Sequence, residues 1–453
     1  MTASQFLDAV TLEIVLNNLR SITDETYIAL MKSAFSTNIK ERNDHSTALI
    51  DPQGRMIALC ERSQPIHLSS MLGLTCALLD KYPLSEFRPG DIFVANDPYV
   101  AGGSHLPDVN LSMPVFVDGE LLCFMCNIAH HADIGGMAPG SMSGGMHEIY
   151  QEGLRIPPIR LFRDGELLTD VLDILLLNAR VPEERRGDYL AQIASCKLGE
   201  RRIHELAQSY DRAHLVSAFD QIIKRTEQRM LRAISQLPAG DYSFEDVMDD
   251  DGFGAKDIPV RVSVRVGGPA ENGRIVVDFT GTSPAVRGNI NVPFRALQSS
   301  VVYALRALLD PDVPSNQGML DAIDIRVPPG TILSAQFPNA VAGRANSCQR
   351  VIDVVLGALA PATAQNAVAA ANGANTAVIF SGVSSETGES YVYLETIGGG
   401  FGGRASKDGT DGVQVHLINT SNLPVEAIEE EYPLIVESYG FVEDSGGAGR
   451  HRG

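Results

Sequence analysis

Short apolar segments joined by tight turns constrain the fold of this chain more than any other feature of its sequence. Residues 109–117 and 120–128 have the composition of strands, and Asp118-Gly119 between them is typical of two-residue hairpins. Residues 46–59 repeat this arrangement around Asp51-Pro52-Gln53-Gly54. The N-terminal part of the chain is therefore predicted to contain β-hairpins.

Helical patterns alternate with these strands along the chain. Apolar residues recur at the helical period in 9–40, 68–81, 166–236, 294–310 and 349–371. Strand patterns occupy 91–95, parts of 242–280, 376–381 and 390–395. The segment 134–153 is rich in Gly, Met and Ser and is predicted to be a long loop, which is typically functional or mobile. The predicted fold class is mixed α/β, of the α+β type.

Length and charge narrow the possible functions. The chain has 453 residues, enough for two or three domains, and its 56 Asp and Glu against 36 Lys and Arg give a net charge of -20. This charge disfavours nucleic acid and anionic membranes as partners. No apolar run is long enough to span a membrane, no signal peptide is recognisable, and six cysteines form no disulfide framework. A cytoplasmic location is therefore expected.

Histidines and carboxylates gather at the ends of predicted strands. Six of the ten histidines lie between residues 45 and 147. The segments concerned are Asp44-His45, His105-Leu106-Pro107-Asp108 and His130-His131-Ala132-Asp133. Imidazole nitrogens and carboxylate oxygens together suit zinc, manganese or iron, so a divalent metal site is predicted. Adjacent strand residues point to opposite faces, so at most one of His130 and His131 is expected to bind the metal directly. Histidines that only cap loops are the alternative.

We expect two main domains around this feature. The first, 1–238, carries the metal and active site and includes the helical section 166–236. The second, 239–439, is a strand-rich α/β domain, and 440–453 is predicted to be a disordered tail. The glycine-rich segment 398–404 does not match a phosphate-binding P-loop or a dinucleotide-binding motif.

Taken together, the motifs resemble those of the hydantoinase B/oxoprolinase family. The resemblance extends over nearly the whole chain. It rests on the segments 41–46 (ERNDHS), 65–68 (PIHL), 96–99 (NDPY), 102–108 (GGSHLPD), 129–136 (AHHADIGG), 279–283 (FTGTS), 289–291 (NIN), 316–318 (NQG) and 398–404 (GGGFGGR). Family members usually continue past residue 453, so further residues are expected on a separate chain or are missing by truncation.

The resemblance implies roles for particular residues. Asp44, His105, Asp108 and His130 are expected to hold the metal, and His131 and Asp133 are expected to line the substrate side as catalytic residues. His131 is a candidate general acid or base. His67 and Asn96 are expected to bind substrate, although His67, at a predicted helix start, can equally be a cap residue.

The resemblance also implies a reaction and a partner. The expected function is that of the metal-bearing subunit of an ATP-dependent cyclic amide hydrolase, which opens a hydantoin, 5-oxoproline or lactam ring. A larger, hydantoinase A-type subunit is expected to bind ATP and phosphorylate the substrate, forming a hetero-oligomer with this chain. A subunit of an ATP-dependent ketone carboxylase is the first alternative, and a non-catalytic scaffold subunit is the second.

Overall fold

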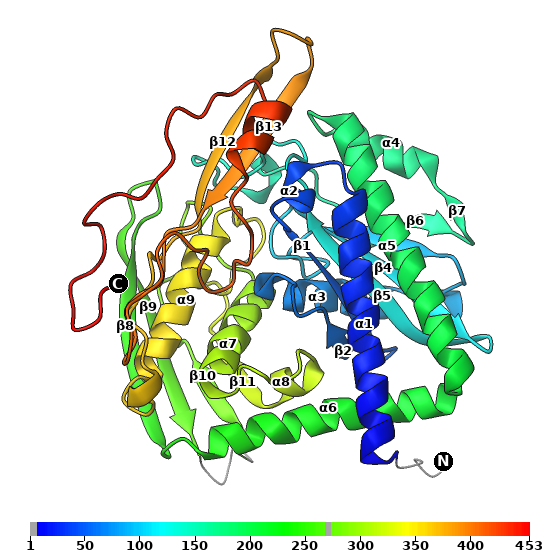
Figure 1. Cartoon of the computed structure of the whole chain (residues 1–453), viewed down its shortest axis with the longest axis horizontal. Helices are drawn as coiled ribbons and strands as arrows, with labels where there is room; N and C mark the ends of the chain where they lie inside the picture. The colour runs from blue at the N-terminus through cyan, green and yellow to red at the C-terminus, as the bar shows by residue number, and fades with distance from the viewer. Residues whose placement is uncertain (1–6, 268–272) are drawn as a thin grey trace.

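A seven-stranded antiparallel sheet organises the N-terminal half of the molecule, in a computed structural model that describes residues 7–267 and 273–453 (Figure 1). The strand order is β2-β1-β5-β4-β3-β6-β7. The strands are β1 (His45–Ile50), β2 (Met56–Leu59), β3 (Ile92–Ala95), β4 (Asp108–Val117), β5 (Glu120–His130), β6 (Ile159–Arg163) and β7 (Glu166–Leu167). The two predicted hairpins therefore form β1–β2 and β4–β5.

The turn between β4 and β5 explains their register. Asp118 and Gly119 have φ values of 53° and 78°, the left-handed conformation that a tight hairpin turn requires at both central positions. With this turn fixed, Asp108 at the start of β4 lies opposite His130 at the end of β5. The hairpin thus brings together two residues that are 22 positions apart in the sequence.

Helices cover both faces of this sheet, which is why its central strands are apolar almost throughout. α1 and α5 pack together on one face, and α3 packs on the other. The side chain of Asp8 accepts the N–H groups of Val10 and Thr11 and so starts α1. The helices are α1 (Ala9–Ser33), α2 (Thr37–Lys40), α3 (Leu68–Lys81), α4 (Thr169–Leu177), α5 (Pro182–Ser209) and α6 (Arg212–Ser235), with short 3-10 turns η1 (Pro65–His67), η2 (Leu84–Glu86) and η3 (Ile149–Gln151).

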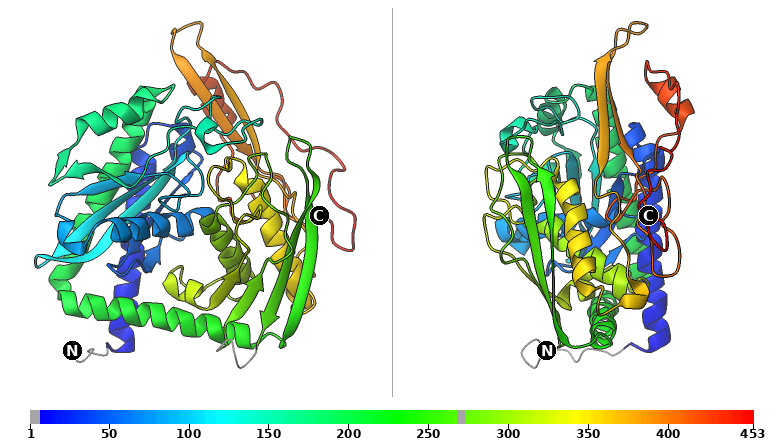
Figure 2. Two further views of the ribbon diagram at one scale, coloured as in Figure 1. Left: turned by 180° about the vertical axis from the view of Figure 1, so that it is seen from behind. Right: turned by 90° about the vertical axis from the view of Figure 1, so that its left-hand side faces the viewer.

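A second sheet of four strands, in the order β11-β10-β9-β8, follows α6. α6 runs along one side of the molecule from the first sheet to the second (Figures 1 and 2). α7 and α9 pack together, and α9 packs directly on β8 and β9. The elements are β8 (Gly240–Asp250), β9 (Lys256–Val266), β10 (Ile275–Asp278), β11 (Ile323–Arg326), α7 (Phe294–Leu309), α8 (Gln317–Asp321) and α9 (Arg344–Leu359).

A β-hairpin projects beyond the two sheets, as Figures 1 and 2 show. It consists of β12 (Thr376–Val383) and β13 (Ser390–Ile397), and it is followed by α10 (Val425–Glu431); a 3-10 turn, η4 (Ala364–Asn366), precedes it. The buried end of β13 returns toward the first sheet, where Leu394 and Thr396 contact residues of the N-terminal part. The C-terminal part of the chain therefore contributes to the environment of the predicted metal residues.

The fold class is confirmed as mixed α/β, and several predicted boundaries change. The predicted helix 9–40 ends at Ser33 and resumes as α2. The predicted helix 349–371 is wrong beyond Leu359, because Pro361 disfavours helical backbone at the residue before it. The section 166–236 begins with strand β7 before its three helices.

The predicted domain boundary at 238 falls between α6 and β8. One cluster of buried apolar side chains nevertheless includes residues of both sheets, among them Phe93 of β3 and Val260 of β9. The division into two domains stays a prediction. So does disorder of the tail: 440–453 has no helix or strand, but Arg452 forms an ion pair with Asp411 at 3.0 Å. Residues 1–6, on which the absence of a signal peptide partly rests, and 268–272, within a predicted strand section, lie outside the described residues.

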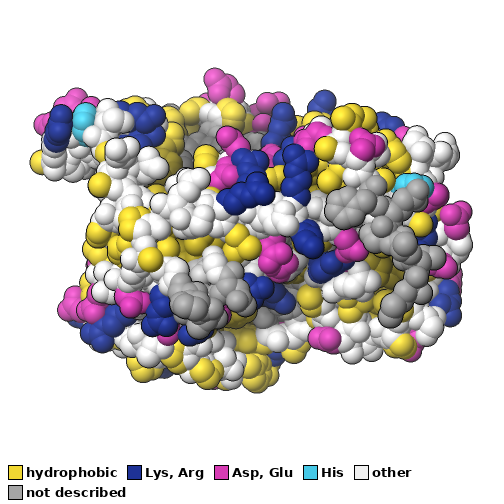
Figure 3. Space-filling model, turned by 90° about the horizontal axis from the view of Figure 1, so that it is seen from below, with side chains coloured by type: hydrophobic (Ala, Val, Ile, Leu, Met, Phe, Trp, Pro, Cys, Tyr) yellow, Lys and Arg dark blue, Asp and Glu magenta, His cyan; other side chains and the backbone are white. Residues whose placement is uncertain are grey.

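The surface is mixed in charge despite the net charge of -20. The face shown in Figure 3 carries Lys and Arg side chains interspersed with Asp and Glu. Ion pairs between exposed side chains, such as Arg225–Glu13 at 3.0 Å, account for part of this pattern. Within residues 7–267 and 273–453, no helix has the length and apolar character needed to cross a membrane.

Candidate metal centre

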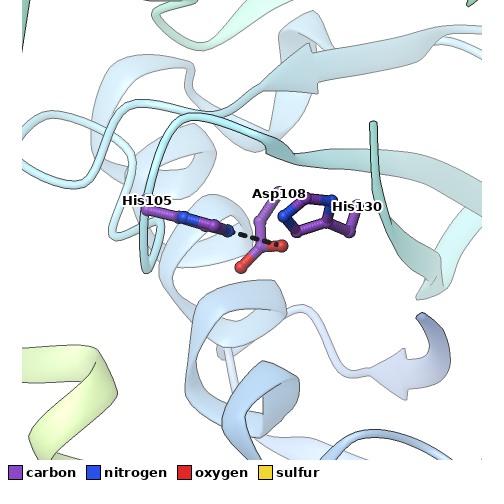
Figure 4. A group of neighbouring side chains, drawn as sticks. All are labelled: His105, Asp108 and His130. Atoms are coloured by element: carbon purple, nitrogen blue, oxygen red, sulfur yellow. Dashed lines mark ion pairs between the residues drawn. The ribbon is translucent and has the colours of Figure 1, made fainter. Parts of the chain in front are cut away.

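Two histidines and one aspartate converge at the open end of the β4–β5 hairpin (Figure 4). His105 lies in the loop before β4, Asp108 begins β4, and His130 ends β5. Nε2 of His105 is 3.1 Å from Oδ1 of Asp108, and the two imidazole ring centres are 5.0 Å apart. All three side chains are buried. We call these three residues the triad.

The triad fits a divalent metal ion. Each residue offers one ligand atom, and these atoms all lie within 4.8 Å of one another. Both ring nitrogens of His105 and Oδ1 of Asp108 are buried and have no hydrogen-bond partner in the described chain. Leaving a buried polar atom unpaired costs about 1–3 kcal/mol, a cost that a bound cation removes. Two imidazoles and one carboxylate suit zinc, manganese or iron.

Asp108 is oriented by partners on its other oxygen. Oδ2 accepts hydrogen bonds from Nη2 of Arg344, at 2.9 Å, and from the hydroxyl of Ser104. Arg344 also donates to the Ser104 hydroxyl at 2.8 Å. With Oδ2 occupied in this way, Oδ1 is the oxygen left facing the two histidines. Partners behind a ligand are typical of metal sites, where they fix ligand orientation.

His130 is held from behind by Asn38 of α2. The amide nitrogen of Asn38 donates to the carbonyl oxygen of His130 at 2.7 Å and lies 3.0 Å from Nδ1 of its ring. The amide oxygen of Asn38 accepts from Nη1 of Arg42 at 2.6 Å. Arg42 is fully buried and also donates to the carbonyl of Leu394 and the hydroxyl of Thr396. Because Nδ1 is engaged, Nε2 remains as the nitrogen that faces the triad.

His67 and Asp44 lie beside the triad. Nε2 of His67 is 3.5 Å from Oδ1 of Asp108 and 3.8 Å from Oδ1 of Asp44. Nδ1 of His67 is 2.9 Å from the hydroxyl of Ser46. Asp44 is therefore next to His67 on the wall of the site and outside the triad.

Burial and neighbouring charges set the protonation states. Burial lowers the pKa of His105 to about 4, and burial and the neighbouring His105 hold the pKa of His130 well below its ordinary value. Burial opposes ionisation of Asp108, but the adjacent His105, His67 and Arg344 outweigh it and hold the pKa of Asp108 well below its ordinary value. Burial raises the pKa of Asp44. Near pH 7 the triad therefore consists of two neutral imidazoles and a carboxylate, the forms that bind metal ions.

A closed cavity of about 30 Å³ adjoins the triad. Its walls come from widely separated parts of the chain. They include Asp44, Gln64, Ile66, His67, Met142, Arg344, Asn375, Leu394, Thr396, Ile418 and Thr420 beside the three triad residues. The C-terminal residues thus complete a site whose metal-binding groups come from the first sheet.

Three predicted site residues do not reach this cavity. His131 turns to the opposite side of the strand end, where Nε2 lies 3.0 Å from Oε1 of Gln192 and the ring packs on Tyr189. Asp133 accepts N–H groups of the loop that follows it and forms an ion pair with Arg180 at 2.8 Å. The geometry gives no support to catalytic roles for His131 and Asp133.

Asn96, predicted to bind substrate, is also remote from the cavity. Its amide donates to the carbonyls of Leu106 and Leu154 and accepts the N–H of Ile156. Asn96 therefore holds together the two loops that flank the end of β3. In contrast, His67 does line the cavity, as its predicted site role requires.

The fold and the triad define a class of α+β protein with a buried centre of two histidines and one carboxylate. The chain belongs to the hydantoinase B/oxoprolinase family, whose model matches residues 8–453, and this confirms the resemblance seen in the sequence. Over 465 residues the chain is 35% identical to a protein named as the B subunit of a D-/L-hydantoinase, from Pseudomonas sp. (strain NS671). That match covers 99% of this chain and 76% of the relative.

Two solved structures share the fold. An ATP-dependent caprolactamase from Pseudomonas jessenii matches with a TM-score of 0.92 and 28% identity, covering 99% of this chain and 77% of that one. A nucleotide-free acetone carboxylase matches with a TM-score of 0.88 and 18% identity, covering 98% of this chain and 61% of that one. The second likeness, at its low identity, concerns the fold alone.

Proposed function

We propose that this chain is the metal-bearing subunit of an ATP-dependent cyclic amide hydrolase, which opens a hydantoin, 5-oxoproline or lactam ring. The observation that carries the proposal is the buried triad with its unpaired ligand atoms on His105 and Asp108. Membership of the hydantoinase B/oxoprolinase family supports the substrate class, as does the similarity to a caprolactamase.

The proposal includes a partner. A relative that is named as a B subunit is one part of a larger assembly, and ATP-dependence is part of the caprolactamase's description. We therefore assign ATP binding and activation of the substrate carbonyl to a larger hydantoinase A-type subunit in a hetero-oligomer. All six cysteines carry free thiols, which agrees with the reducing environment of the cytoplasm, where we place the assembly.

His105, Asp108 and His130 would hold the metal, zinc, manganese or iron. When bound, such an ion polarises a carbonyl oxygen or activates a water molecule. Asn38 and Arg344 keep the ligands in position through their hydrogen bonds to His130 and Asp108. This positioning means that the ligands need not reorganise during the reaction.

The residues beside the triad would move the proton and stabilise charge. Nε2 of His67 faces the cavity and can accept a proton from the attacking water, and Asp44 stabilises the charged ring that results. Arg344 lines the same cavity, so its positive charge stabilises negative charge that develops on the activated carbonyl. Acid–base chemistry is thereby assigned to His67 with Asp44.

Elemental analysis of the purified chain tests the metal site directly. About one equivalent of zinc, manganese or iron is expected in the wild type, with loss of the metal in His105→Ala and in His130→Ala. His131→Ala is the matched control, because this neighbouring histidine does not line the cavity. A metal-free wild type after reloading, or equal metal content in all variants, would contradict the proposal and favour a scaffold role.

The activity assay combines the chain with a candidate large subunit, ATP and a panel of hydantoins, 5-oxoproline and lactams. Ring opening that needs both chains and ATP, and that is lost in His105→Ala, is the expected result. Bicarbonate with a ketone is the parallel arm. A carboxylated product in that arm, without ring opening in the other, would replace the hydrolase proposal by the carboxylase.

A further inference from the structure

A second cavity of about 220 Å³ lies between the start of α3 and helix α7. No residue lines both this cavity and the one at the triad. The two cavities nevertheless lie on opposite sides of the same segments. Pro65 and Leu68 line the larger cavity, whereas Ile66 and His67, between them, line the metal cavity.

The interior of this second cavity is apolar, and its edge is charged. Leu59, Leu68, Val302 and Met319 form part of the wall and are each less than 7% exposed. At the edge, Nη2 of Arg306 donates to Oε2 of Glu61 at 2.8 Å. These side chains are 27% and 42% exposed, so the charged pair lies where the cavity meets solvent. The cavity thus joins an apolar chamber to one positive and one negative group.

We infer that this cavity binds a small α-amino acid with an apolar side chain. Its side chain would occupy the chamber, while its carboxylate contacts Arg306 and its ammonium contacts Glu61. The carboxylate and ammonium of an α-amino acid are attached to one carbon, which matches two opposite charges that lie in contact. Arg306 uses one Nη atom on Glu61, and a guanidinium has five N–H donors, so the ion pair can persist when a ligand binds.

Size and charge exclude the simpler ligands. An apolar cavity of about 150 Å³ is enough for benzene, so the chamber has room for a leucine-sized side chain. A simple carboxylate would meet the negative charge of Glu61, and a simple amine would meet the positive charge of Arg306. Only a ligand that carries both charges is complementary to the pair. The inference concerns a cavity separate from the triad, so it is independent of the proposed hydrolase function.

The position of the cavity gives a bound amino acid contact with the back of the metal site. Asn419 lines the larger cavity, and its backbone N–H donates to the side chain of Gln64, which lines the metal cavity. Asn419 also donates to the carbonyl of Arg62 at 3.0 Å. An occupant therefore rests against the two hydrogen-bonded segments that carry His67 and Thr420.

Calorimetric titration of the full chain tests this inference with three probes. L-Leucine carries both charges, 4-methylpentanoate lacks the ammonium, and 3-methylbutylamine lacks the carboxylate. We expect saturable binding of L-leucine and at least about tenfold weaker binding of each analogue, the loss expected for one charge-assisted hydrogen bond. No saturable binding of L-leucine would overturn the inference, as would binding of either analogue as tight as that of L-leucine.

Variants then locate the binding. Arg306→Gln and Glu61→Gln are each expected to weaken L-leucine binding at least about tenfold. Ala307→Trp, at an exposed position on the cavity wall, is expected to block it. Arg229→Gln is the matched control, because Arg229 forms a similarly exposed ion pair with Asp310 away from the cavity. Thermal unfolding confirms that each variant is folded. Unchanged binding in both Arg306→Gln and Ala307→Trp would place the ligand elsewhere and refute the inference.

Discussion

Replacing Asn38 with alanine is expected to weaken metal binding far more than its effect on stability alone would suggest. Asn38 makes three contacts: it donates to the carbonyl of His130, lies against Nδ1 of His130, and accepts from Arg42. Loss of an outer partner of a ligating histidine lowers metal affinity about 10–100-fold, which corresponds to about 1.4–2.8 kcal/mol. The same loss of buried hydrogen bonds is expected to lower the free energy of unfolding by about 2–4 kcal/mol.

Asn127 provides a matched control for this experiment. It lies on β5, as His130 does, is equally buried, and makes three contacts, with Gln192 and Cys196 on the face away from the cavity. Asn127→Ala should therefore destabilise the fold to a similar extent without changing metal affinity. Competition titration of zinc against a chromophoric chelator measures the affinity, and thermal unfolding measures stability. Equal metal affinities in the two variants would refute the positioning role of Asn38.

Three further predictions follow from the buried groups. Arg344→Met should lower metal affinity about 10–100-fold in the same titration, because Asp108 loses a hydrogen bond that orients it. Burial lowers the pKa of His45 to about 3 and that of His131 to about 4, below the ordinary value of 6.5, so the unfolded chain binds more protons between these values. Stability of the metal-free protein should therefore fall as pH is lowered from about 6.5 toward 4, and a flat melting temperature in scanning calorimetry over that range would contradict the assignment. Burial raises the pKa of Glu152 from 4.5 to about 8, so its ionisation destabilises the fold as pH rises through this window. Glu152→Gln keeps an acceptor for the N–H groups of Val341 and Ala342 and should raise the melting temperature at about pH 9 but not at about pH 5.

The local part of the site could be predicted from the sequence because hairpin geometry is a local property. His105 and Asp108 precede a strand, His130 ends the next strand, and Asp118-Gly119 joins the two strands. The alternation of side chains along a strand also predicted that only one of His130 and His131 would face the site. The structure places His130 in the triad and His131 against α5.

The remaining residues could not be predicted, because packing between distant segments brings them to the site. Arg344 reaches Asp108 across 236 residues of sequence, and Arg42 contacts Leu394 across 352. Neither arginine lies in a pattern that distinguishes it from a surface residue. Asn38 carried even less signal, since it lies within a segment whose helical periodicity explained it fully. The one indication available was the Arg42 position in the ERND motif, next to Asp44.

The size of the metal cavity implies that one of its walls moves when a ring substrate enters. A volume of about 30 Å³ is close to that of one water molecule in the liquid, and a hydantoin or lactam ring is several times larger. Moving β13 would break the hydrogen bonds of buried Arg42 to Leu394 and Thr396, and would release Asn38 from His130. Met142, by contrast, belongs to a loop without helix or strand, in which Ser143 is held by one hydrogen bond from Asn289. Displacement of this loop opens the cavity while the triad and its supporting residues stay in place.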